Sequence, residues 1–418
     1  MRAGYLSARA LRVALGAALV SRVIAWAAAL VAPSLPGDVE ANDLFFDLPR
    51  VTHPFGSHAV NSFFGALAHW DGVWFLLIAN EGYVGPHGIP SALGSAPWHG
   101  SLGFFPGYPS VVRVLSGFAV SPAVVVVVAY MVSLATFVVA LYFVYRLAEL
   151  EMGAKAAMWC TILFALFPGA VFFGTPYAES LFAALCASCL YAARTGRWPV
   201  ACLLAGAAIV TRSPGMLLVV PLALFYLYDP TGRRARRPIR ADALWLLAVP
   251  AALVAYVVYC WHLTGDPFAI NAVGKAYHRG FMDPFTATFQ AFRAGAQAYT
   301  VFLFGVDHSP EYAAFRYADL GGLLAFIAAV PLTVLVFRDL PRPYGWFCVA
   351  SLLLFLGSGP DHHPLSSSMR YLATVPPLFI EAGRLVEDRP RIAWAAATVM
   401  AVSLALVTSA YARWLFVG

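Results

Sequence analysis

Long runs of apolar residues recur from one end of the chain to the other, separated by shorter polar segments. A run of about 20 apolar residues can cross a bilayer as a helix, whereas the strands of a membrane β-barrel give a much weaker alternating pattern. The pattern therefore predicts an all-α polytopic membrane protein. We place about eleven transmembrane helices at residues 10–32, 117–145, 156–174, 177–193, 199–211, 214–228, 241–263, 319–337, 344–358, 371–386 and 392–414.

Basic residues indicate how these helices are oriented. If the N-terminus is cytoplasmic, 17 of the 27 Lys and Arg residues fall in cytoplasmic loops, eight fall in the longer opposite loops, and Arg22 and Arg212 fall inside spans. Cytoplasmic loops carry an excess of Lys and Arg. We therefore predict an N-in/C-out topology with an uncleaved first span and two large external loops, the first and the fourth, at about 33–116 and 264–318.

Two apolar segments need a special interpretation. Residues 60–81 are long enough to cross, but a crossing there would put the basic run at 233–240 outside, so we expect them to lie at the outer interface or to dip in and return. Residues 199–228 have basic residues on both sides and are too short for two full spans. We predict a short hairpin that is broken at 211–215, where Pro214 and Gly215 end the first helix.

This hairpin would place Arg212 within the membrane. A charge at that depth costs at least about 2.5–3.5 kcal/mol, so its side chain should face a polar cavity or a partner. Glu179 is the candidate partner, which would make Arg212 part of a structural ion pair.

Composition supports a membrane protein and excludes several other classes. Of the 418 residues, 61% are hydrophobic and 11% are charged, with a mean hydropathy of +0.74. Soluble domains carry about 45–50% apolar and about 25% charged residues. We see no internal repeat or linker, and so we predict one integral membrane domain over residues 1–418. The net charge of +6 lies in membrane loops and does not indicate nucleic acid, and the six cysteines all lie in apolar runs, where they are expected to be small core residues.

The first external loop holds the strongest candidate for a general base. Asp71 stands between Trp70 and Trp74 in an apolar stretch, and Glu81 follows ten residues later. Partial burial raises the basicity of a carboxylate, which suits proton abstraction from a hydroxyl. A helix cap or a surface ion pair is the alternative role for Asp71.

Three further polar segments fall in predicted external loops. Tyr177 and Glu179 lie at a predicted helix start, where a carboxylate can simply stabilise the helix end. Arg370 and Tyr371 begin another helix and could form an anion site. His362 and His363 precede them and could bind zinc, although adjacent histidines point in different directions. The segment 275–279 could face lipid headgroups.

These motifs occur together in an order that resembles the PIG-V family of mannosyltransferases. The matching pieces are Trp70-Asp71 with Gly82-Tyr83, the segment 104–109, the segment 177–182, Arg212-Ser213-Pro214-Gly215 and Arg370-Tyr371. His69 and Pro214 depart from the family pattern, and the glycine- and proline-rich segment 85–103 points to a different acceptor side. The many Ala, Val and Arg residues and only two lysines predict a bacterial, actinobacterial source.

The resemblance implies a GT-C glycosyltransferase fold and transfer of mannose from a polyprenyl-phosphate-mannose donor, with inversion, on the external face of the plasma membrane. It makes Asp71 the general base. It makes Arg212 and Arg370 contacts of the donor phosphate, and it suggests substrate contacts at Tyr371, Glu179, Tyr177, Glu81, His362 and His363. The acceptor would be a glycolipid or another glycan. No cofactor is expected, although a divalent metal stays open.

Two other functions are compatible with the same residues. A related GT-C enzyme could move arabinose or another sugar from a polyprenyl phosphate. A lipid or solute transporter could use broken helices and the intramembrane Arg22 and Arg212. The lack of an internal repeat and the gathering of polar residues in one external loop favour the transferase.

Overall fold

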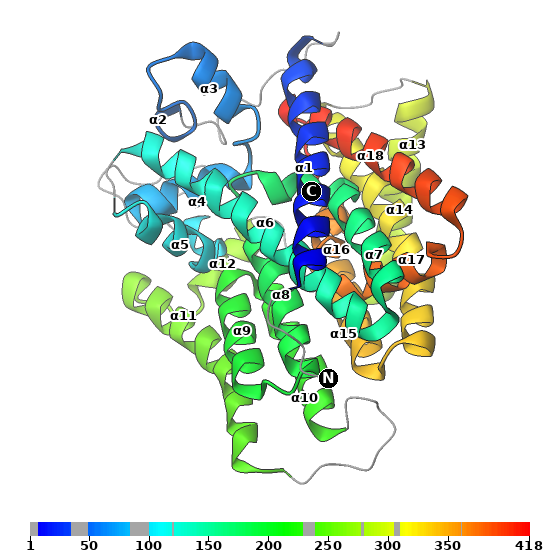
Figure 1. Cartoon of the computed structure of the whole chain (residues 1–418). Coiled ribbons are helices and arrows are strands. Elements are labelled where there is room, and N and C mark those ends of the chain that lie inside the picture. Colours follow the sequence, from blue (N-terminus) through cyan, green and yellow to red (C-terminus); the bar gives the residue numbers. More distant parts are fainter. Residues whose placement is uncertain are drawn as a thin grey trace.

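The computed structural model describes residues 7–34, 49–83, 100–118, 121–228, 239–276, 280–304, 310–360 and 362–418. Every regular element in these ranges is a helix (Figure 1). Eight α-helices in these ranges have 16 residues or more, namely α1 (Ala8–Val31), α6 (Pro122–Met152), α8 (Glu179–Arg194), α11 (Ala248–Thr264), α13 (Pro284–Phe304), α14 (Pro310–Asp339), α15 (Arg342–Gly357) and α18 (Pro390–Ala412). The helices α7 (Ala154–Leu166) and η3 (Pro168–Gly174) form a bent pair.

Shorter helices fill the segments between them. They are η1 (Ala32–Ser34), α2 (Pro49–Thr52), α3 (His58–Gly65), α4 (Asp71–Glu81), η2 (Gly100–Gly103), α5 (Gly107–Leu115), α9 (Trp198–Thr211), η4 (Ser213–Leu218), α10 (Val219–Leu227), η5 (Ala241–Leu247), α12 (Ala269–Ala276), α16 (Ser368–Leu372) and α17 (Pro376–Val386).

The protein is an all-helical, multi-pass membrane protein. Within the described ranges, five helices are long and apolar enough to cross a membrane, or six if the pair of α7 and η3, bent by 76°, is one span. Each of the eleven predicted spans overlaps a helix, but several of these helices are shorter than the about 20 residues that a span needs. The count of eleven and the N-in/C-out topology therefore stay predictions.

The apolar segments 60–81 and 199–228, which were not predicted to be simple spans, each form more than one helix. Residues 60–81 form α3 and α4, and neither helix is long enough to cross alone. In the predicted hairpin, α9 ends at Thr211, Arg212 is extended, and η4 starts at Ser213. A Cβ atom at Gly215 would come within 2.4 Å of the Ile209 backbone nitrogen, so only glycine lets η4 pack this closely on α9.

Helix pairs that are distant in sequence form the core. The first helix, α1, packs along the last one, α18, and also against α6, while α7 packs against α17 (Figure 1). Large side chains such as Tyr145, Phe164 and Phe173 are fully buried between these helices. The packing brings the start of α4, the start of α8 and the short helix α16 to one region.

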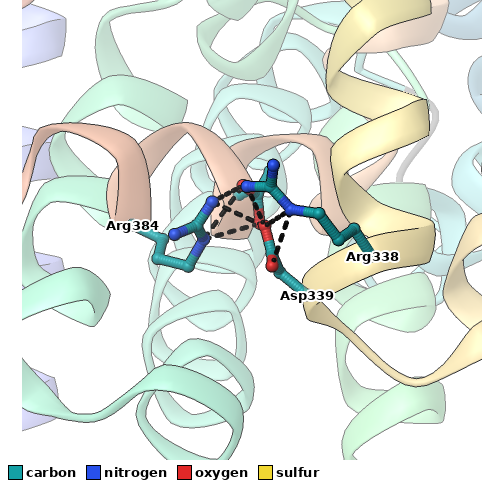
Figure 2. Close-up of polar contacts among 4 residues, drawn as sticks. Arg338, Asp339 and Arg384 are labelled. Carbon is teal, nitrogen blue, oxygen red and sulfur yellow. Dashed lines mark hydrogen bonds and ion pairs between the residues drawn. The ribbon is translucent and has the colours of Figure 1, made fainter.

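A cluster of charged residues forms ion pairs between the end of α14 and α17. We call Arg338, Asp339, Glu381 and Arg384 the α14–α17 cluster (Figure 2). Arg384 Nη2 lies 2.6 Å from Asp339 Oδ2 and 2.5 Å from Glu381 Oε1, while Arg338 Nη2 lies 2.9 Å from Asp339 Oδ2.

Candidate active site

A cavity of about 690 Å³ opens where the predicted site residues meet. Its lining comes from α4, η2, the start of α8, the break after α9, α12, the residues before α13, α15 and α16. Asp71, Glu179, Arg212, Arg370 and Tyr371 all belong to this lining. Five of the nine residues predicted from sequence therefore meet at one cavity.

Asp71 is the first residue of α4, and part of its side chain stays open to the cavity. Arg370 Nη1 donates a hydrogen bond to Asp71 Oδ2 at 2.6 Å. The Asp71 side chain keeps 30% of its surface exposed, whereas Arg370 keeps only 4%. Asp71 is thus ion-paired, but with a buried arginine and not in the surface pair of the alternative interpretation, and its side chain also lines the cavity, as a base must.

Glu179 joins the two arginines of the site. It is the first residue of α8 and is 1% exposed. Its Oε1 accepts a hydrogen bond from Arg212 Nη1 and lies 3.2 Å from Arg370 Nε. Both expectations for Arg212 are confirmed, since it pairs with Glu179 and also lines a cavity that holds other polar groups. We call Asp71, Glu179, Arg212 and Arg370 the cavity cluster.

Aromatic rings enclose the guanidinium of Arg370. Its Cζ lies 5.6 Å, 5.9 Å and 5.3 Å from the ring centroids of Phe172, Tyr177 and Tyr371. Arg212 Cζ lies 5.0 Å from the Tyr371 ring, so this ring contacts both cations. Burial lowers the pKa of Arg370, but the Asp71 and Glu179 carboxylates outweigh it and hold the pKa well above its usual value. Arg370 therefore stays charged.

Two buried hydroxyls hold the backbone just before Asp71. Trp70 has a positive φ of 52°, which is rare for a residue other than glycine. The preceding carbonyl, of His69, accepts hydrogen bonds from Tyr177 Oη at 3.0 Å and from Tyr411 Oη at 2.9 Å. The His69 ring also stacks on Trp414 at 3.8 Å. These contacts from η3–α8 and α18 determine the direction in which α4 starts and therefore where Asp71 lies.

Tyr177 was expected to contact substrate, but it lies behind Asp71, is 1% exposed and does not line the cavity. Tyr411 was not predicted from sequence at all. It lies 342 residues from His69 along the chain, and no local pattern marks it.

Three other predicted site residues lie away from the cavity lining. Glu81 ends α4, about 15 Å along the helix axis from Asp71. His363 Nδ1 lies 2.6 Å from Asp319 Oδ2, and His362 is exposed. Lys275 does line the cavity, whereas residues 277–279 lie outside the described residues. Asn271 and Phe281 also line it and were missed, because nothing near them in sequence distinguishes them from loop residues.

The described residues contain no group of three or more His, Cys, Asp or Glu side chains that could hold a metal ion. The cavity cluster itself offers two carboxylates, each already paired with a guanidinium. These pairs make the described part of the cavity a setting for charge stabilisation and proton transfer by side chains.

The chain is similar in sequence to named proteins of mammals. The chain is 29% identical over 168 residues to a protein of Cricetulus griseus called GPI alpha-1,6-mannosyltransferase 2, covering 38% of this chain and 31% of that protein. The human protein of that name is 28% identical over 183 residues, covering 42% and 34%. The chain thus spans about a third of the length of these relatives.

The apo oligosaccharyltransferase of Archaeoglobus fulgidus aligns in structure with 98% of this chain and 56% of its own, at a TM-score of 0.48 and 14% identity. Residues 15–261, which include Asp71, Glu179 and Arg212, match the family described as Mannosyltransferase (PIG-V). Because this match covers more than half of the sequence, the chain belongs to the PIG-V mannosyltransferase family.

Proposed function

We propose that the protein moves a mannosyl residue from polyprenyl-phosphate-mannose to a glycolipid or glycan acceptor on the external face of the plasma membrane. The observation that carries this proposal is the cavity cluster, in which a partly exposed carboxylate lies beside two guanidiniums in a member of a mannosyltransferase family. A carboxylate and fixed cations in one cavity are what transfer from a phosphate-linked sugar requires.

Asp71 would act as the general base. Its carboxylate takes the proton of the acceptor hydroxyl while that oxygen attacks the anomeric carbon of mannose. The bond from this carbon to the phosphate oxygen breaks, and polyprenyl phosphate leaves with the bonding electrons. This single in-line displacement inverts the anomeric carbon and needs no enzymic nucleophile, so one exposed carboxylate is sufficient.

Arg370 and Arg212 would stabilise the leaving phosphate. Each guanidinium has five N–H donors, so its carboxylate pair leaves other donors for phosphate oxygens. The charge on the phosphate grows as the sugar departs, so fixed cations favour the transition state over the ground state. Tyr371, which contacts both guanidiniums, would keep them in place.

The acceptor proposed here is a lipid-linked glycan. The relatives are named for mannose transfer to GPI, a glycolipid. In a bacterium the corresponding acceptors are phosphatidylinositol mannosides or lipomannan-type glycans. Glycolipid profiling of a deletion strain by mass spectrometry should reveal one missing mannosylated species, which would identify the acceptor.

The decisive test is transfer of radiolabelled mannose from polyprenyl-phosphate-mannose by the purified protein. Incorporation into lipid extract that depends on Asp71 would support the proposal. Transfer of arabinose in place of mannose would make the protein another polyprenyl-phosphate-dependent glycosyltransferase. Flux of label into liposomes without any new glycosidic bond would make it a transporter and overturn the proposal.

Cysteine labelling tests the external location. Gly280 lies near the C-terminal end of α15, since Met282 N donates to Gly357 O at 3.0 Å, and Arg342 begins the same helix at its other end. A cysteine at Gly280 should react with an impermeant thiol reagent in intact cells, and one at Arg342 should not. The six native cysteines are buried and give a low background. Labelling at Arg342 alone would put the cavity on the cytoplasmic side.

A further inference from the structure

The charged residues of the cavity lining come from two sources. The cavity cluster supplies two carboxylates that balance its two guanidiniums. Helix α12 supplies Lys275, near its end. Among the described residues that line the cavity, Lys275 is the charged side chain that forms no ion pair within the described ranges. The described lining therefore holds one positive charge that is not balanced.

Helix α12 turns a polar face towards the cavity. Asn271 and Lys275 are four residues apart, so they lie on the same face of the helix, and both line the cavity and are exposed. The other face is anchored, because Ala269 and Val273 are 1% and 3% exposed in a cluster with Tyr256. Gly103 allows this packing, since a Cβ atom there would come within 2.9 Å of Val273 Cγ1. The amide and the ammonium are therefore held on a fixed support.

Large apolar side chains lie beside this polar face. Phe281 is 91% exposed and Leu353, on α15, is 53% exposed, yet both belong to the cavity lining. If the predicted span at 344–358 crosses the membrane, the exposed surface of Leu353 faces the hydrocarbon region. The cavity thus combines a cationic and amide surface with an apolar opening towards the membrane, which suits a phosphate attached to a long hydrocarbon chain.

We infer that Asn271 and Lys275 join Arg212 and Arg370 as contacts of the phosphate of the lipid-linked sugar donor, and that its hydrocarbon chain leaves the cavity between Phe281 and Leu353. This inference rests on the proposed function for its substrate and adds the orientation of that substrate. The sugar then lies beside Asp71, which pairs with Arg370.

The test compares Lys275→Gln with Lys155→Gln, a change at the other lysine of the chain. Lys155 is a matched control because its side chain is 60% exposed and pairs with Asp388, away from the cavity lining. Lys275→Gln should raise the donor KM about tenfold and weaken inhibition by farnesyl phosphate by a similar factor, since a charge-assisted hydrogen bond is lost. Its kcat should stay within about threefold of the parent value, as expected for lost ground-state binding. Lys275→Arg should restore most of the binding, and Lys155→Gln should change neither quantity.

Two further probes separate a lipid phosphate from a free one. Inorganic phosphate should inhibit the parent protein far less than farnesyl phosphate does. Phe281→Ser should weaken inhibition by farnesyl phosphate and leave inhibition by inorganic phosphate unchanged. Equal inhibition by both probes would indicate a site for a free anion and would overturn the lipid assignment. An unchanged donor KM and unchanged farnesyl phosphate inhibition in folded Lys275→Gln would overturn the phosphate site.

The failure of this inference can be distinguished from the failure of the proposed function. If Asp71→Asn abolishes mannose transfer while Lys275→Gln binds farnesyl phosphate normally, the inference fails and the proposed function stands. If the parent protein transfers no mannose, the proposed function fails. Thermal-shift titration with farnesyl phosphate then still tests the site, because binding alone stabilises the folded protein, and the shift should be smaller for Lys275→Gln than for Lys155→Gln.

Discussion

The cavity cluster and the α14–α17 cluster have the same composition, two arginines with one aspartate and one glutamate, but they lie in different settings (Figure 2). The α14–α17 cluster joins two adjacent residues of α14 to two residues of α17 that are three positions apart, and its Arg338 side chain is 63% exposed, although Glu381 is buried. The cavity cluster joins four separate parts of the chain, and its Arg370 side chain is 4% exposed. Only the cavity cluster lines the 690 Å³ cavity.

The difference shows that a network of ion pairs is not by itself evidence of a catalytic site. Exposed ion pairs, such as that of Arg338 with Asp339, contribute about 0–1 kcal/mol and mainly stabilise local structure. In the cavity cluster, Arg370 and Glu179 are buried, and low exposure to water strengthens the electrostatic interactions between the charged groups. The Asp71 side chain is 30% exposed, so its carboxylate stays accessible to a ligand. A buried set of charges with one accessible member beside a cavity is an arrangement suited to catalysis.

The largest expected effect is the difference in transfer activity between variants of the aspartate in each cluster. Asp71→Asn should lower mannose transfer by about 10²-fold or more, because general-base catalysis typically contributes 10²–10⁴-fold. Asp339→Asn, in the α14–α17 cluster, should leave transfer within about twofold of the parent value. Both are measured with purified protein at saturating donor. Near-normal turnover in folded Asp71→Asn would remove Asp71 as the base.

The second prediction concerns the arginines. Arg370→Ala should leave very little activity, and Arg370→Lys should keep part of it, since lysine retains the charge but loses the planar fork that matches phosphate oxygens. Removing one partner of a buried ion pair costs about 3–5 kcal/mol, so thermal unfolding must be measured alongside transfer. Arg384→Ala, the matched change in the α14–α17 cluster, should keep nearly full activity. Full activity in a folded Arg370→Ala variant would contradict the phosphate role.

The third prediction concerns the hydroxyl that helps to position Asp71. Tyr411→Phe removes one of two hydrogen bonds to the His69 carbonyl and should lower kcat about three- to tenfold, with little change in donor KM, because Asp71 loses alignment. Tyr108→Phe is the control, since its buried hydroxyl bonds Ala129 O at 2.9 Å and is not bonded to the backbone before Asp71. An equal loss of kcat in both variants would indicate a general packing effect and no positioning role.

The smallest expected effect concerns the α14–α17 cluster alone. Glu381→Gln should reduce the free energy of unfolding by about 1–3 kcal/mol, because the fully buried carboxylate loses its charge beside Arg384. Transfer activity per folded molecule should not change. A change in donor KM or kcat would show that this cluster is coupled to the cavity, which would end the contrast between the two clusters.

Local sequence was sufficient to predict much of the architecture. The apolar runs predicted helices at every span, and Pro214 and Gly215 predicted the break at which Arg212 lies. The same reading selected Asp71, Glu179 and Arg370, because charged residues are costly in apolar surroundings and therefore stand out there. The span count is less determined, since hydropathy does not say how a short or bent helix crosses the bilayer.

What the sequence alone determined is thus the helical membrane character, the positions of the breaks and the identity of four charged residues, all of which depend on near neighbours in the chain. Tertiary structure decided that these four residues meet at one cavity, that Tyr177 lies behind Asp71 beside Tyr411, and that Glu81 and His363 lie elsewhere. It also placed Asn271 and Lys275 in the lining of the same cavity as Asp71. The physical reason is that such contacts join residues up to 342 positions apart, and only the packing of whole helices determines which of their faces meet.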